Sequence, residues 1–124
     1  MLQVPTILVV DDEPLVRGLT RRVLDTAGYK VVLANDGVSA MEQLRAANTD
    51  IDLVLLDVVM PGQNGREVLE SIADEFPKTR FLFMSGFTAN AMSGAFFREN
   101  GYPFLQKPFQ PDDLVDAVYD ALHS

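Results

Sequence analysis

Cysteine is absent from the chain, and basic side chains are few. Without cysteine the protein can form neither a disulfide framework nor a thiolate zinc site. Its 10 lysines and arginines stand against 18 aspartates and glutamates, which gives a net charge of −8. Because that charge repels a phosphate backbone, we expect no direct binding to nucleic acid.

Long apolar runs are absent as well. No run reaches the roughly 20 residues that span a bilayer, and the apolar stretch LVLLDVVMPG is interrupted by Asp57. The amino-terminal MLQVPT has neither the basic region nor the apolar core of a signal peptide. These absences predict a soluble, cytoplasmic protein with no membrane contact in this chain.

The chain does contain a regular alternation of short apolar runs and amphipathic segments. Hydrophobic residues make up 48% of the 124 residues, which suits a single domain over residues 1–124. The predicted strands are Thr6–Val10, Lys30–Ala34, Leu53–Asp57, Arg80–Ser85 and Tyr102–Gln106. The predicted helices, with apolar residues on one face, are Pro14–Ala27, Ser39–Ala47, Gly65–Phe76 and Pro111–His123.

A fifth helix is predicted over Thr88–Asn100, but its pattern is the weakest. Gly94 lies in its middle and costs about 1 kcal/mol relative to alanine. A helix so marginal is either an accident of sequence or a part that moves.

Strands rich in consecutive Val, Leu and Ile, alternating with helices, indicate a parallel sheet covered on both faces. Five strands and five helices suit an α/β fold of the flavodoxin-like (βα)5 type, a three-layer sandwich with strand order 2-1-3-4-5. Pro103 lies inside the last predicted strand. Proline is tolerated mainly at a sheet edge, where this order places that strand.

Polar side chains follow the carboxyl ends of four predicted strands. The first strand is followed by Asp11, Asp12 and Glu13, and the third ends in Asp57. Ser85 ends the fourth strand, and Lys107 follows the fifth. In this fold, ligands bind beyond these strand ends, at the switch point between strands 1 and 3. We therefore expect the carboxylates, the hydroxyl and the ammonium to share one rim.

Clustered carboxylates are costly, since two unit charges at 4 Å repel by about 4 kcal/mol at an effective dielectric of 20. A hard divalent cation relieves this repulsion, and Mg²⁺ binds through one or two carboxylates. A cation, a lysine and a hydroxyl around Asp57 suit phosphoryl transfer.

Each of these residues also has a structural interpretation. Asp12 or Glu13 could cap a helix that begins at Pro14. Ser85 belongs to an ordinary turn dipeptide, and Lys107 taken alone would be a solvated lysine. Only their joint placement at four strand ends favours a functional site.

At this point the residues match a family. The motifs ILVVDDEP, LVLLDVVMPGQNG, FMSG and FLQKPF occur in that order along the chain. With them the whole chain resembles the receiver (CheY-like) domain of two-component response regulators.

The resemblance implies a role for each site residue. Asp57 is the phosphoacceptor, and the donor is a phosphohistidine of a sensor histidine kinase or histidine phosphotransfer domain. Lys107 contacts the phosphoryl oxygens, and Ser85 moves to donate a hydrogen bond to them. The ligands of Mg²⁺ (or Mn²⁺) are Asp12, Asp57, Asp11 through water, and the backbone carbonyl of Val59. The Lys107–Pro108 bond is expected to be cis.

The resemblance also implies a switch rather than an enzyme, although the domain promotes its own phosphorylation and dephosphorylation. Movement of Ser85 lets Phe104 turn inward, and the segment between them shifts. We expect a downstream protein to read the change on Thr88–Asn100, Tyr102–Gln106 and Pro111–His123. Val59 and Phe87 are apolar, so neither can orient an attacking water, and we predict slow autodephosphorylation.

Three rival hypotheses remain at this stage. A haloacid-dehalogenase-type phosphatase needs a second aspartate where this chain has Val59. A flavodoxin would meet repulsion between its cofactor phosphate and Asp11–Glu13. A phosphorylation-independent receiver is the third, but every acceptor-site residue is present. His123, the only histidine, lies near the carboxyl end and is expected to be solvated rather than a phosphodonor.

The chain is expected to be either a stand-alone regulator or a fragment of a larger protein with no output domain attached. The FMSGF and GYPFLQKPF segments resemble receivers appended to hybrid sensor histidine kinases, which favours the second interpretation.

Overall fold

A computed structural model describes residues 4–46, 50–60, 63–85, 97 and 99–123. The strands are β1 (Thr6–Val10), β2 (Lys30–Ala34), β3 (Leu53–Asp57), β4 (Val59–Met60), β5 (Gln63–Asn64), β6 (Arg80–Ser85) and β7 (Phe104–Gln106). The helices are α1 (Pro14–Thr26), α2 (Gly37–Ala46), α3 (Gly65–Glu75) and α5 (Pro111–Leu122).

Five strands form one parallel sheet in the order β2-β1-β3-β6-β7. This order confirms the predicted flavodoxin-like arrangement, with the first strand between the second and third. The register pairs Asp57 at the end of β3 with Met84, so Ser85 lies one position further along β6. The end of β3 is thus at the centre of the sheet's carboxyl edge.

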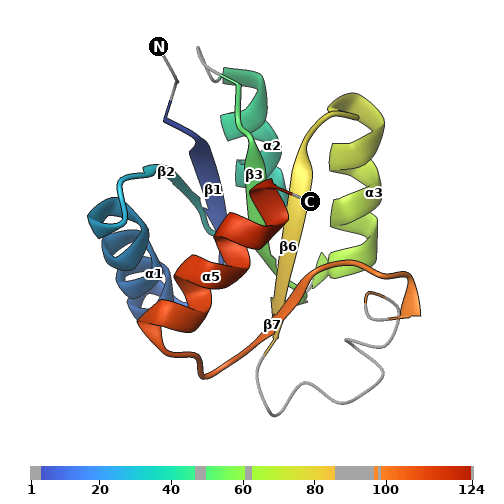
Figure 1. The fold of residues 1–124 in the computed structure, drawn as a ribbon. Coiled ribbons are helices and arrows are strands. Elements are labelled where there is room, and N and C mark those ends of the chain that lie inside the picture. The colour runs from blue at the N-terminus through green and yellow to red at the C-terminus, as the bar shows by residue number, and fades with distance from the viewer. Residues whose placement is uncertain (1–3, 47–49, 61–62, 86–96, 98, 124) are drawn as a thin grey trace.

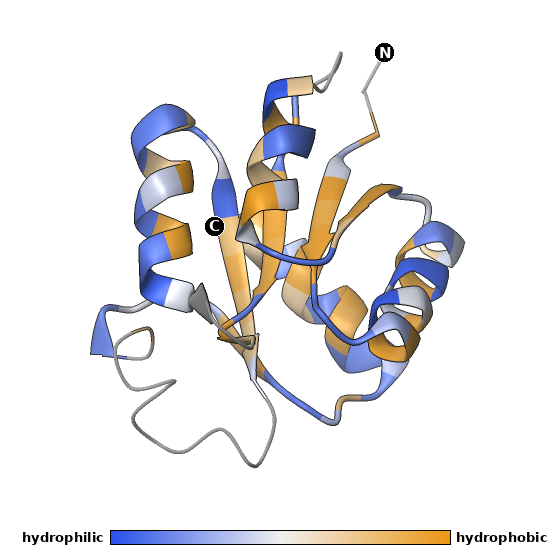
Figure 2. Cartoon of the chain, turned by 180° about the vertical axis from the view of Figure 1, so that it is seen from behind, coloured by the Kyte–Doolittle hydropathy of each residue, from blue (hydrophilic) through white to orange (hydrophobic). Residues whose placement is uncertain are grey.

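The sheet separates two hydrophobic cores, because neighbouring side chains of a strand point to opposite faces. On one face Ile7, Val9 and Leu55 pack with residues of α1 and α5. On the other face Leu8 and Leu56 pack with residues of α2 and α3. Figure 1 shows α1 and α5 in front of the sheet, and Figure 2 shows the orange sides of the helices turned toward its apolar strands. This three-layer packing explains why the strands are apolar at consecutive positions.

The predicted boundaries hold for the first four strands and shift at the fifth. β7 begins at Phe104, two residues later than predicted. Pro103 therefore precedes the strand rather than lying inside it, although β7 is an edge strand. The carbonyl of Pro103 accepts a hydrogen bond from the Phe83 amide at 3.0 Å. Proline has no N–H to add to the ladder, so it joins the sheet only through this acceptor.

The helices differ from the prediction at their ends. α2 begins at Gly37, two residues before the predicted start. Asp36 accepts a hydrogen bond from the Ser39 amide at 2.7 Å, so the Asp36 side chain caps the helix and Ser39 already lies inside it. α1, α3 and α5 each end one residue earlier than predicted.

A short hairpin after β3 was not predicted. β4 and β5 pair antiparallel, with Val59 opposite Asn64 and Met60 opposite Gln63. Residues 61–62, between the two strands, lie outside the described residues. Two-residue strands are too short to show the alternation from which a strand is recognised.

The predicted helix Thr88–Asn100 lies mostly outside the described residues, as does Phe87. Within the part of the chain that is described, no helix has the length and apolar character needed to cross a bilayer.

Candidate functional site

The carboxyl edge of the sheet brings the predicted site residues together. Asp11 follows β1, Asp57 ends β3, Ser85 ends β6 and Lys107 follows β7. The amide of Lys107 donates to the Ser85 carbonyl at 2.7 Å, which ties the last two strand ends to each other. Asp11, Asp57 and Ser85 are at most 3% exposed.

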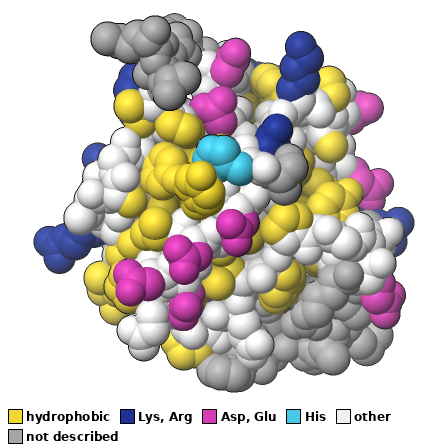
Figure 3. Space-filling model, in the orientation of Figure 1, with side chains coloured by type: hydrophobic (Ala, Val, Ile, Leu, Met, Phe, Trp, Pro, Cys, Tyr) yellow, Lys and Arg dark blue, Asp and Glu magenta, His cyan; other side chains and the backbone are white. Residues whose placement is uncertain are grey.

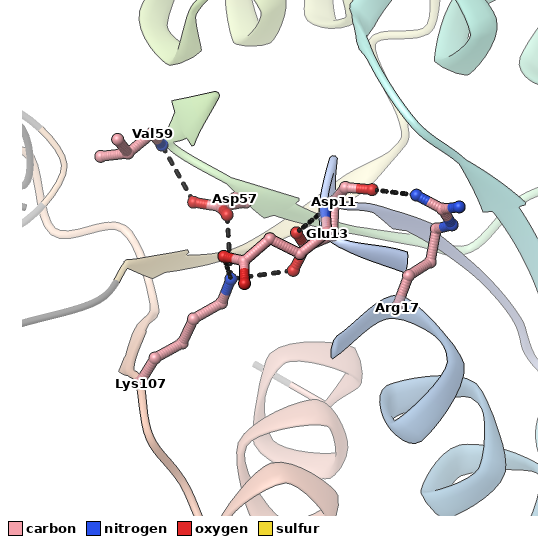
Figure 4. A network of polar contacts seen from close by, with 6 residues as sticks. All are labelled: Asp11, Glu13, Arg17, Asp57, Val59 and Lys107. Atoms are coloured by element: carbon pink, nitrogen blue, oxygen red, sulfur yellow. Dashed lines mark hydrogen bonds and ion pairs between the residues drawn. The ribbon is translucent and has the colours of Figure 1, made fainter. Parts of the chain in front are cut away.

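Lys107 lies at the centre of this group. Its Nζ contacts Asp11 Oδ2 at 2.8 Å and Asp57 Oδ2 at 2.9 Å, and lies 3.8 Å from Glu13 Oε1. The Lys107 side chain is 12% exposed. Figure 4 shows it reaching from the loop after β7 toward the carboxylates of the two central strands. One ammonium thus bridges two buried carboxylates that the chain separates by 46 positions.

Four carboxylates gather at this edge of the sheet, and three of them lie within 4 Å of the Lys107 ammonium. One oxygen from each of Asp11, Asp12, Glu13 and Asp57 lies within 4.8 Å of the others. Asp12 is half-buried and Glu13 is exposed. Lys107 cannot neutralise four acids, and a set of hard oxygen donors is what Mg²⁺ or Mn²⁺ prefers. The donor chemistry of the cluster therefore fits a divalent cation.

Burial and the Lys107 ammonium shift the pKa of Asp57 in opposite directions. Burial raises the pKa of Asp57, and although the hydrogen bond from Lys107 and that from the Val59 amide oppose it, the pKa stays above its ordinary value. For Lys107, burial lowers the pKa, but Asp11 and Asp57 outweigh it and the pKa is raised. The protein itself thus leaves Asp57 short of stabilisation as an anion, while Lys107 is held as a cation.

The Asp57 carboxylate is also fixed by the chain that follows it. The amide of Val59 donates to Asp57 Oδ1 at 2.9 Å. Gly65 at the start of α3 packs against Val58, and a Cβ at Gly65 would lie 3.0 Å from the Val58 Cα. A side chain at Gly65 would therefore push on the segment that holds Asp57. Gly65 was predicted only as a helix start, and its spacing within LVLLDVVMPGQNG was the available signal.

The hydroxyl oxygen of Ser85 is unpaired within the part of the chain that the structure describes. Its hydroxyl is buried, and no group among the described residues hydrogen-bonds to it. A buried, unpaired hydroxyl costs about 1–3 kcal/mol. Such a group at a strand end beside Asp57 is suited to a ligand that supplies the missing acceptor. Phe104, the predicted partner of Ser85 in the switch, is half-buried and packs against the core between the sheet and α2 and α3.

The acids before α1 are not explained by capping. Glu13 occupies the N-cap position, but its side chain makes no capping hydrogen bond. Asp11 instead accepts the Glu13 amide at Oδ1, at 3.0 Å. The alternative that Asp12 or Glu13 serves to cap this helix therefore loses its main support.

One contact of the site was missed in the sequence. Nη1 of Arg17, on α1, donates to the backbone carbonyl of Asp11 at 2.7 Å. A long side chain one turn inside a helix gives no pattern that would show its target. The cis Lys107–Pro108 bond, by contrast, was predicted and is confirmed.

Comparison with known proteins agrees with this geometry. Residues 7–119 match the family model of the response regulator receiver domain. The chain therefore belongs to the receiver domain family, whose members act in phosphorelay signal transduction of two-component systems. This membership sets aside the phosphatase and flavodoxin hypotheses.

The chain is also similar to individual known proteins. It is 34% identical over 117 residues to the sensor kinase CckA of Brucella abortus, covering 94% of this chain and 12% of CckA. It is 30% identical over 113 residues to the chemotaxis protein CheY of Thermotoga maritima, covering 90% of this chain and 92% of CheY. The solved structure of NtrX from Brucella abortus superposes with a TM-score of 0.86 at 29% identity, covering 98% of this chain and 27% of that one. The chain thus spans a small part of CckA and NtrX and nearly all of CheY.

Proposed function

We propose that the chain is a single receiver domain over residues 1–124, in which Asp57 accepts a phosphoryl group. The donor is a phosphohistidine on a sensor histidine kinase or a histidine phosphotransfer domain. The observation that carries this proposal is the buried Asp57 carboxylate bound to Lys107 within a cluster of four acids. On this proposal the domain is a phosphoacceptor switch in the cytoplasm, and not an enzyme acting on a diffusible substrate.

The transfer forms one bond and breaks one bond. A carboxylate oxygen of Asp57 attacks phosphorus, the phosphorus–nitrogen bond to the imidazole breaks, and the histidine leaves with the bonding pair. Lys107 stays protonated, because its pKa is raised, and it faces the charge that accumulates on the phosphoryl oxygens.

The cation site of the proposal is built from Asp12, Asp57, water-mediated Asp11 and the carbonyl of Val59. When bound there, Mg²⁺ or Mn²⁺ neutralises the acids and the entering phosphoryl oxygens. The carboxylate oxygens of the cluster lie within 4.8 Å of one another, and this closeness supports the role.

Phosphorylation then brings hydrogen-bond acceptors to the neighbourhood of Ser85. The phosphoryl group adds roughly −1.5 to −2 charge and three strong acceptor oxygens. Ser85 Oγ, which has no partner among the described residues, gains an acceptor if it turns toward Asp57. Phe104 then turns inward into the space that Ser85 leaves. The phosphoryl group favours this state by the strength of that new bond, so part of the population is already active without it.

The output surface of the proposal comprises β7, α5 and the segment Thr88–Asn100, and a downstream protein binds there. Exposed aspartates line the α5 part of this surface, and Figure 3 shows acidic side chains gathered where α5 runs: Asp112, Asp113, Asp116 and Asp120. Such a surface repels nucleic acid, which supports a protein target. The match to a sensor kinase supports a place within a hybrid kinase, and the match to CheY supports a stand-alone regulator.

The test is phosphorylation by acetyl phosphate in the presence of Mg²⁺, followed by intact mass spectrometry. We expect one phosphoryl group on the wild-type chain and none on Asp57→Asn. Asp52→Asn is the matched control, because Asp52 precedes the same strand at its opposite end, and we expect it to be labelled like wild type. Equal labelling of Asp57→Asn and wild type would refute the proposal.

A further inference from the structure

Arg17 uses its guanidinium in an unusual way for an arginine in an acidic setting. Three acids, Asp11–Glu13, lie just before its helix. Yet among the described residues no carboxylate lies within ion-pairing distance of Arg17, and its hydrogen bond goes to the backbone carbonyl of Asp11. Figure 4 shows this contact on the side of Asp11 away from Lys107. Arg17 therefore does not neutralise the cluster by pairing with one of its acids.

The contact completes the immobilisation of Asp11. Arg17 holds its backbone oxygen, the Glu13 amide holds Oδ1, and Lys107 holds Oδ2. The Asp11 amide, in turn, donates to the Ala34 carbonyl of β2 at 3.2 Å. Every polar atom of Asp11 is thus bound, although the residue lies one position beyond the end of β1.

The orientation of Asp12 follows from this bond. The carbonyl of Asp11 and the amide of Asp12 belong to one peptide unit, which is planar. A hydrogen bond that fixes the direction of the carbonyl fixes the whole plane, and with it the position from which the Asp12 side chain extends. Asp12 is only half-buried, so packing constrains it less than it constrains Asp11 and Asp57.

We propose that Arg17 is a positioning residue for the cation site, which presents the Asp12 carboxylate by holding the Asp11–Asp12 peptide unit. The inference rests on the proposed function, because it takes the acidic cluster to be a Mg²⁺ or Mn²⁺ site. Arg17 does not touch the cation or the phosphoryl group. Its effect reaches the reaction only through the ligand that it orients.

The test is a direct measurement of cation binding. Mn²⁺ is titrated into wild type, Arg17→Met and Arg21→Met, and the free ion is followed by electron paramagnetic resonance. Arg21 lies one turn further along α1 and is paired with Asp25, at 3.4 Å, so its replacement removes the same charge without touching Asp11. We expect Arg17→Met to weaken Mn²⁺ binding about 10-fold, as the loss of an outer partner of a metal ligand typically does. Arg21→Met removes only a solvent-screened charge, so we expect less than about a two-fold change.

A second measurement separates positioning from general damage. The rate of phosphorylation by acetyl phosphate is recorded against Mg²⁺ concentration. We expect Arg17→Met to need about 10-fold more Mg²⁺ for half of its maximal rate, with the maximal rate close to that of wild type. Should Arg17→Met fail to fold, Arg17→Gln keeps a polar side chain at the same place, is too short to reach the carbonyl, and is expected to show the same shift.

The outcomes distinguish this inference from the function on which it rests. Wild type that neither binds Mn²⁺ nor becomes phosphorylated would refute the proposed function. Normal wild-type behaviour, with Arg17→Met matching Arg21→Met in both measurements, would refute the role of Arg17 alone. A lower maximal rate without a shift in Mg²⁺ requirement would also overturn it, because orientation of a cation ligand must change affinity.

Discussion

The two ends of the central sheet use polar side chains differently. At the amino end, Asp52 accepts the Thr6 amide at 2.8 Å, and Arg80 donates to the Leu122 carbonyl at the end of α5. Each of these side chains completes a backbone group. At the carboxyl end, Asp57 and Lys107 bind each other inside the protein, and the Ser85 hydroxyl has no partner among the described residues.

The difference separates stabilising polar groups from functional ones. A side chain that satisfies a backbone donor or acceptor contributes about 0.5–1.5 kcal/mol to stability. Buried like charges and an unpaired hydroxyl act against stability, and they persist where a ligand makes use of them. Because both ends belong to one sheet, matched substitutions at the two ends can test this division.

The largest difference between the two ends of the sheet is expected when the basic side chain at each end, Lys107 or Arg80, is replaced. Lys107→Met should lower the rate of phosphorylation by acetyl phosphate about 100-fold, as the loss of one preorganised charge donor does. Arg80→Met removes a cation from the other end and should leave the rate unchanged while lowering the free energy of unfolding. Both rates are measured by mass spectrometry at saturating Mg²⁺. A similar loss of rate in both variants would show that the two ends are not functionally distinct.

The two aspartates should differ in the sign of their effect on stability. In metal-free protein, Asp57→Asn should raise the free energy of unfolding, because burial raises the pKa of Asp57 and so disfavours its charged form in the folded state. Asp52→Ala should lower it by about 1 kcal/mol, because the Thr6 amide loses its acceptor. Urea unfolding with a chelator present measures both, and a loss of stability in Asp57→Asn would contradict the comparison.

The pH dependence of the free energy of unfolding, compared between wild type and Asp57→Asn, gives a sharper test. A carboxyl whose pKa is raised on folding gives stability that is lost as pH rises from its unfolded value, about 4, through its folded value. The stability advantage of metal-free Asp57→Asn over wild type should therefore be near zero below about pH 4 and grow toward neutral pH. The raised pKa of Lys107 acts in the same sense, with stability lost only above its ordinary value of about 10.5. An advantage that is constant with pH would place its origin in packing rather than in charge.

Sequence reasoning found the members of the site because topology alone brings them together. Asp11, Asp57, Ser85 and Lys107 each end or follow a parallel strand, and parallel strands end at one edge. Their positions needed no side-chain geometry. The same logic located the strand order, since apolar runs and helical faces have clear periods.

The features that sequence reasoning missed are side-chain contacts and element boundaries. They depend on distances in the folded chain that no sequence periodicity encodes. The directions of long side chains decide which carboxylates Lys107 contacts. They also decide that Arg17 donates to a backbone carbonyl. The start of β7 at Phe104 was missed because the extent of an edge strand depends on its one neighbour. The β4–β5 hairpin was missed because its strands have two residues each.

The smallest effect on stability is expected from replacing two serines, Ser39 and Ser85. The comparison separates a hydroxyl at the phosphoacceptor site from one elsewhere at the same end of the sheet. Ser39 lies in the first turn of α2, and its hydroxyl donates to Asn35 Oδ1 at 2.8 Å. Ser39→Ala should lower the free energy of unfolding by about 1 kcal/mol, because the amides of Asn35 and Asp36 lose the hydroxyl that accepts from them. Ser85→Ala removes a buried hydroxyl that has no partner among the described residues, so it should leave stability unchanged or slightly higher.

The same serine substitution should matter once the acceptor is loaded. With Mg²⁺ and beryllofluoride bound to wild type, NMR shifts are expected in β7, where Phe104 lies, and Ser85→Ala should reduce them while Ser39→Ala does not. Because α2 also begins at the carboxyl end of the sheet, this result would assign the effect to the phosphoacceptor site and not to that end as a whole. If Ser85→Ala destabilised the free protein as much as Ser39→Ala, its hydroxyl would have a structural partner, and the switch would need another trigger.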